Sequence, residues 1–104
     1  MTQCRIVNQD VHIIFIESDE VPIIKRLDNG TEIEFIDDNV SAIILPNFLN
    51  QLPPGLQFNE LELETINEID KDLIQIIFNI KGPKATNSIR ATLDISSLHQ
   101  KLYI

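Results

Sequence analysis

The chain has 104 residues, of which 43% are hydrophobic and 23% charged, a composition typical of a single globular domain spanning residues 1–104. Its net charge of −8 argues against direct binding to nucleic acid or to an anionic membrane, because both would repel it. The single cysteine, Cys4, excludes an intrachain disulfide and a multi-cysteine zinc site. Since we see no leader and no long apolar run, we expect a cytoplasmic protein.

Short segments rich in β-branched residues predict strands through the first half of the chain, which contains many of the 19 isoleucines. We expect a short strand at residues 5–8 and a stronger one at residues 11–16. A solvated acidic turn follows, and Pro22 then opens the next strand, where a missing N–H is tolerated. Another strand is expected at residues 40–45.

The four residues Asp28-Asn29-Gly30-Thr31 give the clearest turn signal. Asn-Gly at the centre predicts a type I′ hairpin, because both residues tolerate positive φ. The expected register pairs Arg26 with Ile33, Lys25 with Glu34, and Ile24 with Phe35. The core side of this hairpin is then expected to carry Ile24, Ile33 and Phe35.

Pro46 is expected to begin one helical turn over residues 47–52, since proline suits the first helical position. Phe48, Leu49 and Leu52 would form its apolar side. The sequence Pro53-Pro54-Gly55 ends this turn and separates two β-rich halves.

Residues 58–72 allow two interpretations. As a helix, Asn59 and Glu62 form a capping box, and Ile66 and Ile69 recur at helical spacing. As a strand, leucines alternate strictly with Glu60, Glu62 and Glu64. We favour the strand, as one arm of a hairpin that turns at residues 68–72.

Residues 73–80 form the most apolar run and are expected to make a central strand, because one face is apolar and the other half apolar. Residues 88–95 alternate well and should pair with this strand across a loop at 82–87. Ser96 or Ser97 would then cap a short helix containing Leu98 and Leu102. The predicted fold is mostly β, a sandwich or partly open barrel of about seven short strands with one or two short helices. It becomes α+β if residues 58–72 are helical.

Few residues of this chain suit catalysis or cofactor binding. Cys4 lies near a terminus, and His12 and His99 are too far apart in sequence to form a local metal motif. The three glycines are widely separated, so no phosphate-binding loop is present. We therefore expect a protein that is not an enzyme and holds no cofactor or metal.

The leading hypothesis is a small acidic binding protein that masks a basic protein partner, such as a nucleic-acid-processing enzyme or a toxin. Bacterial immunity proteins and nuclease inhibitors work in this way, an analogy of size and charge alone. Residues 1–72 carry a net charge of −11 and residues 73–104 one of +3. The carboxylates predicted to bind the partner are Asp19, Glu20, Glu32, Glu34, Glu60, Glu62 and Glu64.

Two further hypotheses belong to other classes. A structural or adaptor subunit could assemble through its sheet edges, including as a homo-oligomer, because isoleucine-rich strands must cover their edges or use them. A β domain that binds a small ligand is the third, although six aromatic residues and no tryptophan make a stacking pocket less favourable.

Overall fold

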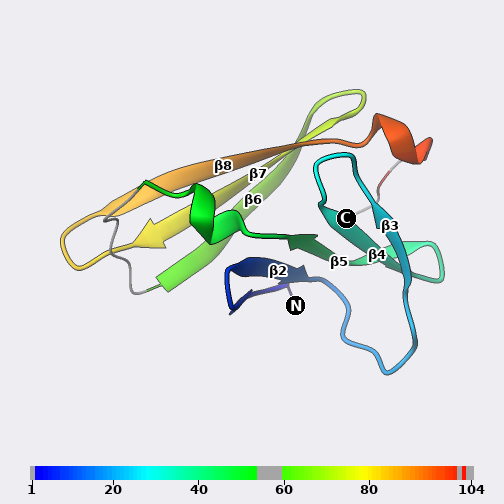
Figure 1. Ribbon diagram of the computed structural model, residues 1–104, viewed down its shortest axis with the longest axis horizontal. Coiled ribbons are helices and arrows are strands. Elements are labelled where there is room, and N and C mark those ends of the chain that lie inside the picture. Colours follow the sequence, from blue (N-terminus) through cyan, green and yellow to red (C-terminus); the bar gives the residue numbers. More distant parts are fainter. Residues whose placement is uncertain (1, 54–59, 101, 103–104) are drawn as a thin grey trace. The chain divides into compact units, whose positions relative to one another are not determined.

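The computed structural model describes residues 2–53, 60–100 and 102, and its regular structure is almost entirely β (Figure 1). Within these residues eight strands form one five-stranded and one three-stranded sheet, in which all neighbours are antiparallel. The mostly-β prediction is confirmed. The chain divides into two compact units, Met1–Gln51 with Ser97–Ile104, and Leu52–Ser96. The single domain and the sandwich or barrel stay predictions.

The first unit contains the five-stranded sheet, whose strand order is β1-β2-β5-β4-β3. This order leaves β1 and β3 at the two edges. The strands are β1 (Gln3–Val7), β2 (Asp10–Ile14), β3 (Ile23–Arg26), β4 (Glu32–Ile36) and β5 (Asn39–Leu45).

One face of this sheet forms the core of the first unit. Val11 and Ile13 of β2 alternate with residues that face away, and so do Ile33 and Phe35 of β4. Ile13 lies between neighbours on β1 and β5, is fully buried, and pairs with Ile43, which is also fully buried. Burying a side chain of this size contributes about 1.5–3 kcal/mol, so this face supplies most of the driving force for the unit.

The β3–β4 hairpin forms where Asn-Gly predicted it, but its register differs from the prediction by one residue. Arg26 lies opposite Glu32, and Lys25 opposite Ile33. The Gly30 N–H donates to the Leu27 carbonyl at 3.0 Å, and the Leu27 N–H to the Thr31 carbonyl at 2.7 Å. Gly30 has a φ of 91°. These contacts define a three-residue loop with a left-handed glycine at its end, in place of the two-residue type I′ turn.

The shifted register also changes the side chains that face the core. Ile33 and Phe35 are buried as predicted, but Ile24 is 54% exposed, because it lies opposite Glu34 on the other face. Lys25 takes the place beside Phe35, with its ammonium 5.5 Å from the ring centre. The predicted Lys25–Glu34 pair is therefore wrong.

The β4–β5 hairpin has the two-residue turn that was expected at Asn-Gly. Asp37 and Asp38 have φ values of 50° and 65°, and Ile36 pairs with Asn39 across them. Short polar side chains tolerate this left-handed backbone better than other non-glycine residues do. A bulge follows at Ser41, where the pairing shifts from Phe35–Val40 to Glu34–Ala42.

The predicted helical turn after Pro46 is a 3-10 turn, η1 (Phe48–Gln51), which begins two residues after the proline. Asn47 has a φ of 54°, so a helix cannot start there. Its N–H donates to Asp10 Oδ1 at 2.8 Å, and the Leu49 N–H donates to the Gln9 carbonyl at 3.1 Å, which ties the turn to the β1–β2 loop. Pro54 and Gly55 of the predicted break lie outside the described residues.

The second unit contains the three-stranded sheet, made of β6 (Glu60–Asp70), β7 (Leu73–Lys81) and β8 (Thr86–Asp94). As predicted, β7 is the central strand, and β8 pairs with it. Ile76, Phe78 and Ile80 are at most 1% exposed. The loop between β7 and β8 is shorter than predicted, since β8 already begins at Thr86.

Residues 60–70 form a strand, so the helical interpretation of this segment is wrong for the described residues; Phe58 and Asn59 lie outside them. Leu61 and Leu63 face Ile80 and Phe78, whereas Ile66 faces Ile76. These inward-facing residues are first two and then three positions apart, because a bulge at Glu64 inserts a residue that has no residue directly opposite. A bulged strand thus imitates helical spacing in the sequence.

The last predicted helix is a single 3-10 turn, η2 (Ser96–Leu98). Asp94 supports its start, because its Oδ1 accepts a hydrogen bond from the Ser96 N–H at 2.9 Å. Hydrogen bonding by the Ser96 side chain, and then by its N–H, lowers the pKa of Asp94. Leu102 lies beyond the turn, so the longer helix that was expected to contain both leucines does not form.

Candidate functional site

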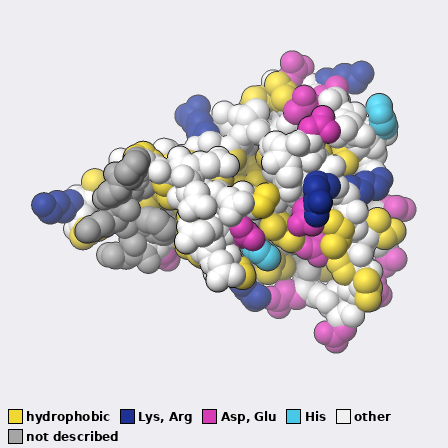
Figure 2. All heavy atoms as spheres, viewed as in Figure 1, with side chains coloured by type: hydrophobic (Ala, Val, Ile, Leu, Met, Phe, Trp, Pro, Cys, Tyr) yellow, Lys and Arg dark blue, Asp and Glu magenta, His cyan; other side chains and the backbone are white. Residues whose placement is uncertain are grey.

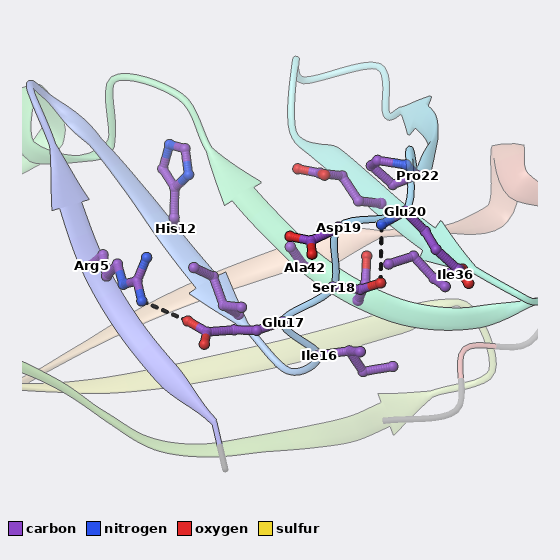
Figure 3. Close-up of a pocket in the computed structure, with 13 residues that line it drawn as sticks. Arg5, His12, Ile16, Glu17, Ser18, Asp19, Glu20, Pro22, Ile36 and Ala42 are labelled. Carbon is purple, nitrogen blue, oxygen red and sulfur yellow. Dashed lines mark hydrogen bonds and ion pairs between the residues drawn. The ribbon is translucent and has the colours of Figure 1, made fainter.

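A hollow of about 530 Å³ opens on the first unit, on the face of the five-stranded sheet opposite the core (Figure 3). Strand alternation builds this face, because His12 and Ile14 of β2 point away from buried Val11 and Ile13. Cross-strand pairing brings Arg5 opposite His12 and Glu34 opposite Ala42. The volume falls within the range of small-ligand pockets, about 300–1,000 Å³.

The segment between β2 and β3 forms one wall of the hollow. The N–H groups of Phe15 and Ile16 both donate to the Ser41 carbonyl, at 2.8 and 3.1 Å. The bulge at Ser41 frees this carbonyl from the ladder, so it can anchor the segment. Farther along, the Glu20 N–H donates to Ser18 Oγ at 3.1 Å, which shapes a local turn. Figure 3 shows Glu17 of this segment joined to Arg5, with Ser18 and Glu20 farther from it.

The hollow is acidic. Its titratable lining residues are Arg5, His12, Glu17, Asp19, Glu20 and Glu34. Arg5 Nη2 donates to Glu17 Oε1 at 2.6 Å, an ion pair with both side chains more than half exposed. Such surface pairs contribute about 0–1 kcal/mol. Within the described chain no ion pair neutralises the other three carboxylates.

The structure gathers three of the seven predicted partner-binding residues at this hollow: Asp19, Glu20 and Glu34. Glu32 lies on the same strand as Glu34, but its Oε1 pairs with Arg26 Nη2 at 3.2 Å. Glu60, Glu62 and Glu64 belong to the second unit. The predicted acidic surface is thus divided between two sheets.

The carboxylates of β6 have a cation of their own. Lys81 on β7 lies opposite Glu60, and its Nζ is 3.1 Å from Glu62 Oε1 and 4.0 Å from Glu60 Oε2. This ammonium lowers the pKa of Glu62, and the two carboxylates raise the pKa of Lys81. Glu64 is exposed at the bulge. The row that alternation predicted therefore contains two carboxylates around one lysine.

Cys4 and His12 lie on opposite faces of the first sheet. Cys4 pairs with Ile13 on the core side, whereas His12 lines the hollow. Burial raises the pKa of the Cys4 thiol, which disfavours the reactive thiolate. The two side chains are therefore not arranged as a nucleophile and its base. Among residues 2–53, 60–100 and 102, no group of three or more His, Cys, Asp or Glu side chains is placed to hold a metal ion.

Sequence reasoning missed Arg5, His12 and Glu17 as residues of one site. The alternation of β2 was a usable signal, because it separates His12 from the buried residues on either side. The approach of Arg5 and Glu17 had no comparable signal, since it depends on the path of the segment after β2.

No family model, curated protein or solved structure matches this chain. Its two described helical segments are single 3-10 turns, and neither has the length or apolar character needed to cross a membrane.

Proposed function

We propose that this protein is a non-enzymatic binding protein that masks a basic protein partner with the acidic hollow of its five-stranded sheet. One observation carries the proposal: Glu17, Asp19, Glu20 and Glu34 line a single hollow that contains one arginine. Neighbouring like charges cost stability unless a cation compensates them. A partner surface rich in lysine and arginine would supply those cations.

Exposed apolar side chains beside the carboxylates support protein binding over solubility alone. Val21 is 92% exposed and Ile16 is 39% exposed, and both belong to the segment that carries Glu17, Asp19 and Glu20. Figure 2 shows acidic and hydrophobic side chains intermingled on the surface it displays. A stable interface combines a desolvated apolar centre with a polar rim, and this segment offers both kinds of side chain.

The proposed mechanism is occlusion. If the partner acts on nucleic acid, the carboxylates of the hollow would stand where substrate phosphates bind. Attraction between opposite charges would raise the association rate and favour the correct partner, more than it would raise affinity. Under this proposal the protein performs no chemistry and needs no cofactor. It acts in the cytoplasm, where its one cysteine needs no disulfide partner.

The test compares two triple charge reversals in capture experiments from the native source, followed by mass spectrometry at low and high salt. Asp19→Lys, Glu20→Lys and Glu34→Lys together alter the hollow. Glu68→Lys, Asp70→Lys and Asp72→Lys alter exposed carboxylates of the second unit by the same total charge.

We expect the unaltered chain and the second-unit variant to retain one basic partner that high salt loosens, and the hollow variant to lose it. A partner that the hollow variant still retains would overturn the proposal. Equal loss in both variants would do so as well, because net charge rather than the hollow would then explain binding.

A further inference from the structure

The loop between β3 and β4 contains an asparagine followed directly by a glycine. Asn29-Gly30 is the one such pair in a sequence with nine asparagines. A backbone nitrogen that follows an asparagine can attack the carbon of its side-chain amide, and a glycine places no Cβ in the way of this attack. Asn29 is exposed, so water reaches it. The loop therefore brings together a nucleophile, an electrophile and water.

Two hydrogen bonds hold the reacting groups while the hairpin is folded. The Gly30 N–H donates to the Leu27 carbonyl at 3.0 Å, so the nucleophile is held through its proton. The Thr31 N–H donates to Asn29 Oδ1 at 3.0 Å, which fixes the side-chain amide and draws electrons from its carbon. The second bond prepares the amide carbon for attack. The first opposes attack, so it must break before the Gly30 nitrogen can react.

We propose that Asn29 is a site of spontaneous deamidation and isomerisation in the native protein, reached when the hydrogen bond from Gly30 to Leu27 opens. The Gly30 nitrogen loses its proton and bonds to Asn29 Cγ. The bond from Cγ to Nδ2 breaks, and Nδ2 takes up a proton and leaves as ammonia. The product is a five-membered succinimide ring that joins the two residues.

Water then opens the ring, giving its hydroxyl to a carbonyl carbon and its proton to the Gly30 nitrogen. Breaking the bond from this nitrogen to Cγ gives an aspartate at position 29. Breaking its bond to the Asn29 backbone carbon gives an isoaspartate, whose backbone is longer by one methylene group. Either product exchanges an amide nitrogen for an oxygen and adds one negative charge.

The two products differ in their effect on the hairpin. Aspartate leaves the backbone unchanged, and its carboxylate can still accept the Thr31 N–H. Isoaspartate lengthens the loop that sets the register of β4, the strand that carries Glu34 into the hollow. We therefore expect the isoaspartyl form to have a weakened hairpin. The modification is independent of the proposed masking function, since it needs no partner.

The test incubates the full chain at mildly alkaline pH, folded in buffer and unfolded in urea. Peptide mapping by mass spectrometry then follows deamidation at every asparagine and distinguishes aspartate from isoaspartate. We expect Asn29 to convert first in both conditions, and about tenfold or more slowly in the folded chain, because opening the loop costs its hydrogen bonds. Gly30→Ala should slow conversion in urea, where the folding of the variant does not matter.

Asn87 is the comparison within the same chain, since it precedes Ser88 and pairs with Ile80 on β7. Faster conversion of Asn87 than of Asn29 in the folded chain would overturn the inference. An Asn29 that stays intact in the folded chain would do so as well, and so would equal rates in buffer and in urea.

The effect on the hairpin has its own control. The isoaspartyl form, purified by chromatography, should unfold at a lower urea concentration than Asn29→Asp, which adds the same charge to an unaltered backbone. Equal unfolding of the two forms would show that the loop accepts the extra methylene group, and the weakened hairpin would then be refuted.

Discussion

The hollow of the five-stranded sheet and the carboxylate row of the three-stranded sheet begin from the same sequence feature. Each contains a strand carboxylate beside buried apolar residues, Glu34 between Ile33 and Phe35 in the first and Glu62 after Leu61 in the second. Glu62 lies 3.1 Å from the Lys81 ammonium, whereas Glu34 lies opposite Ile24 and Ala42 and has no cation among the described residues. One group of carboxylates is therefore compensated within its sheet, and the other remains available to a partner.

The cross-strand neighbour, rather than the number of acids, decides whether an acidic strand can bind a basic partner. A two-residue loop at Asn29-Gly30 would have paired Lys25 with Glu34 and compensated it. The three-residue loop moves Lys25 opposite Ile33, where its ammonium lies over the Phe35 ring. The shift of one residue in the register therefore leaves Glu34 without an ion pair to any described residue.

The two faces of β2 should differ most strongly in how much a truncation to alanine lowers stability. Ile13→Ala should lower the free energy of unfolding by about 2–5 kcal/mol, because Ile13 is fully buried and the change leaves a cavity. His12→Ala, one residue away on the hollow face, should change it by less than about 0.5 kcal/mol. Urea unfolding monitored by circular dichroism measures both variants. Similar losses would mean that the hollow face is packed and does not provide an open surface.

The sequence predicted the elements that can be recognised from the alternation of apolar and polar residues along one strand. The alternation in β7 and β8 identified both strands and their inward faces, since burial repeats every second residue there. The bulge at Glu64 broke this period, so the same evidence supported a helix and a strand. Periodicity cannot resolve a strand whose register changes in its middle.

The hollow could not be predicted in the same way, because it depends on contacts between strands. Loop length fixed the neighbours of Glu34, and the bulge at Ser41 freed the carbonyl that anchors the segment after β2. Neither feature has a distinct residue signature in this chain. The acidic character of the segment was predicted, but its assembly with Arg5 and His12 was not.

A smaller effect is expected at the turn that sets the register. Gly30 has a φ of 91°, and a Cβ added there would meet Pro46 Cγ at 3.6 Å, an ordinary contact. Gly30→Ala should therefore lower the free energy of unfolding by about 1–2 kcal/mol through backbone strain alone. Denaturant unfolding measures this change. Asp38→Gly is the comparison in the neighbouring hairpin, and should raise stability, because it relieves the left-handed strain of a non-glycine residue.

A smaller change is expected in the pKa of Glu62, which pairs with Lys81. Lys81→Gln should raise the pKa of Glu62 toward its ordinary value, because the ammonium that lowers it is removed. Carboxyl chemical shifts followed by NMR during a pH titration measure this change. Lys84→Gln, in the exposed β7–β8 loop, is the control of equal charge and should leave the Glu62 pKa where it is.

The sign of the pH dependence follows from the directions of the two shifts. The folded-state pKa of Glu62 is lowered, so the stabilisation is present above the ordinary glutamate pKa and is lost as pH falls through the lowered value. The pKa of Lys81 is raised, so stabilisation is also lost as pH rises through that raised value. Unaltered and Lys81→Gln chains should therefore differ most in stability near neutral pH and converge at both extremes.

Removal of a carboxylate should change stability in opposite directions in the second unit and at the hollow. Glu62→Gln should lower stability near neutral pH, because Lys81 loses its nearest partner. Glu34→Gln should raise stability slightly, because it removes one of four neighbouring carboxylates and no ion pair. If both changes lowered stability alike, Glu34 would be paired with a cation within the fold. The electrostatic argument for a basic partner at the hollow would then be wrong.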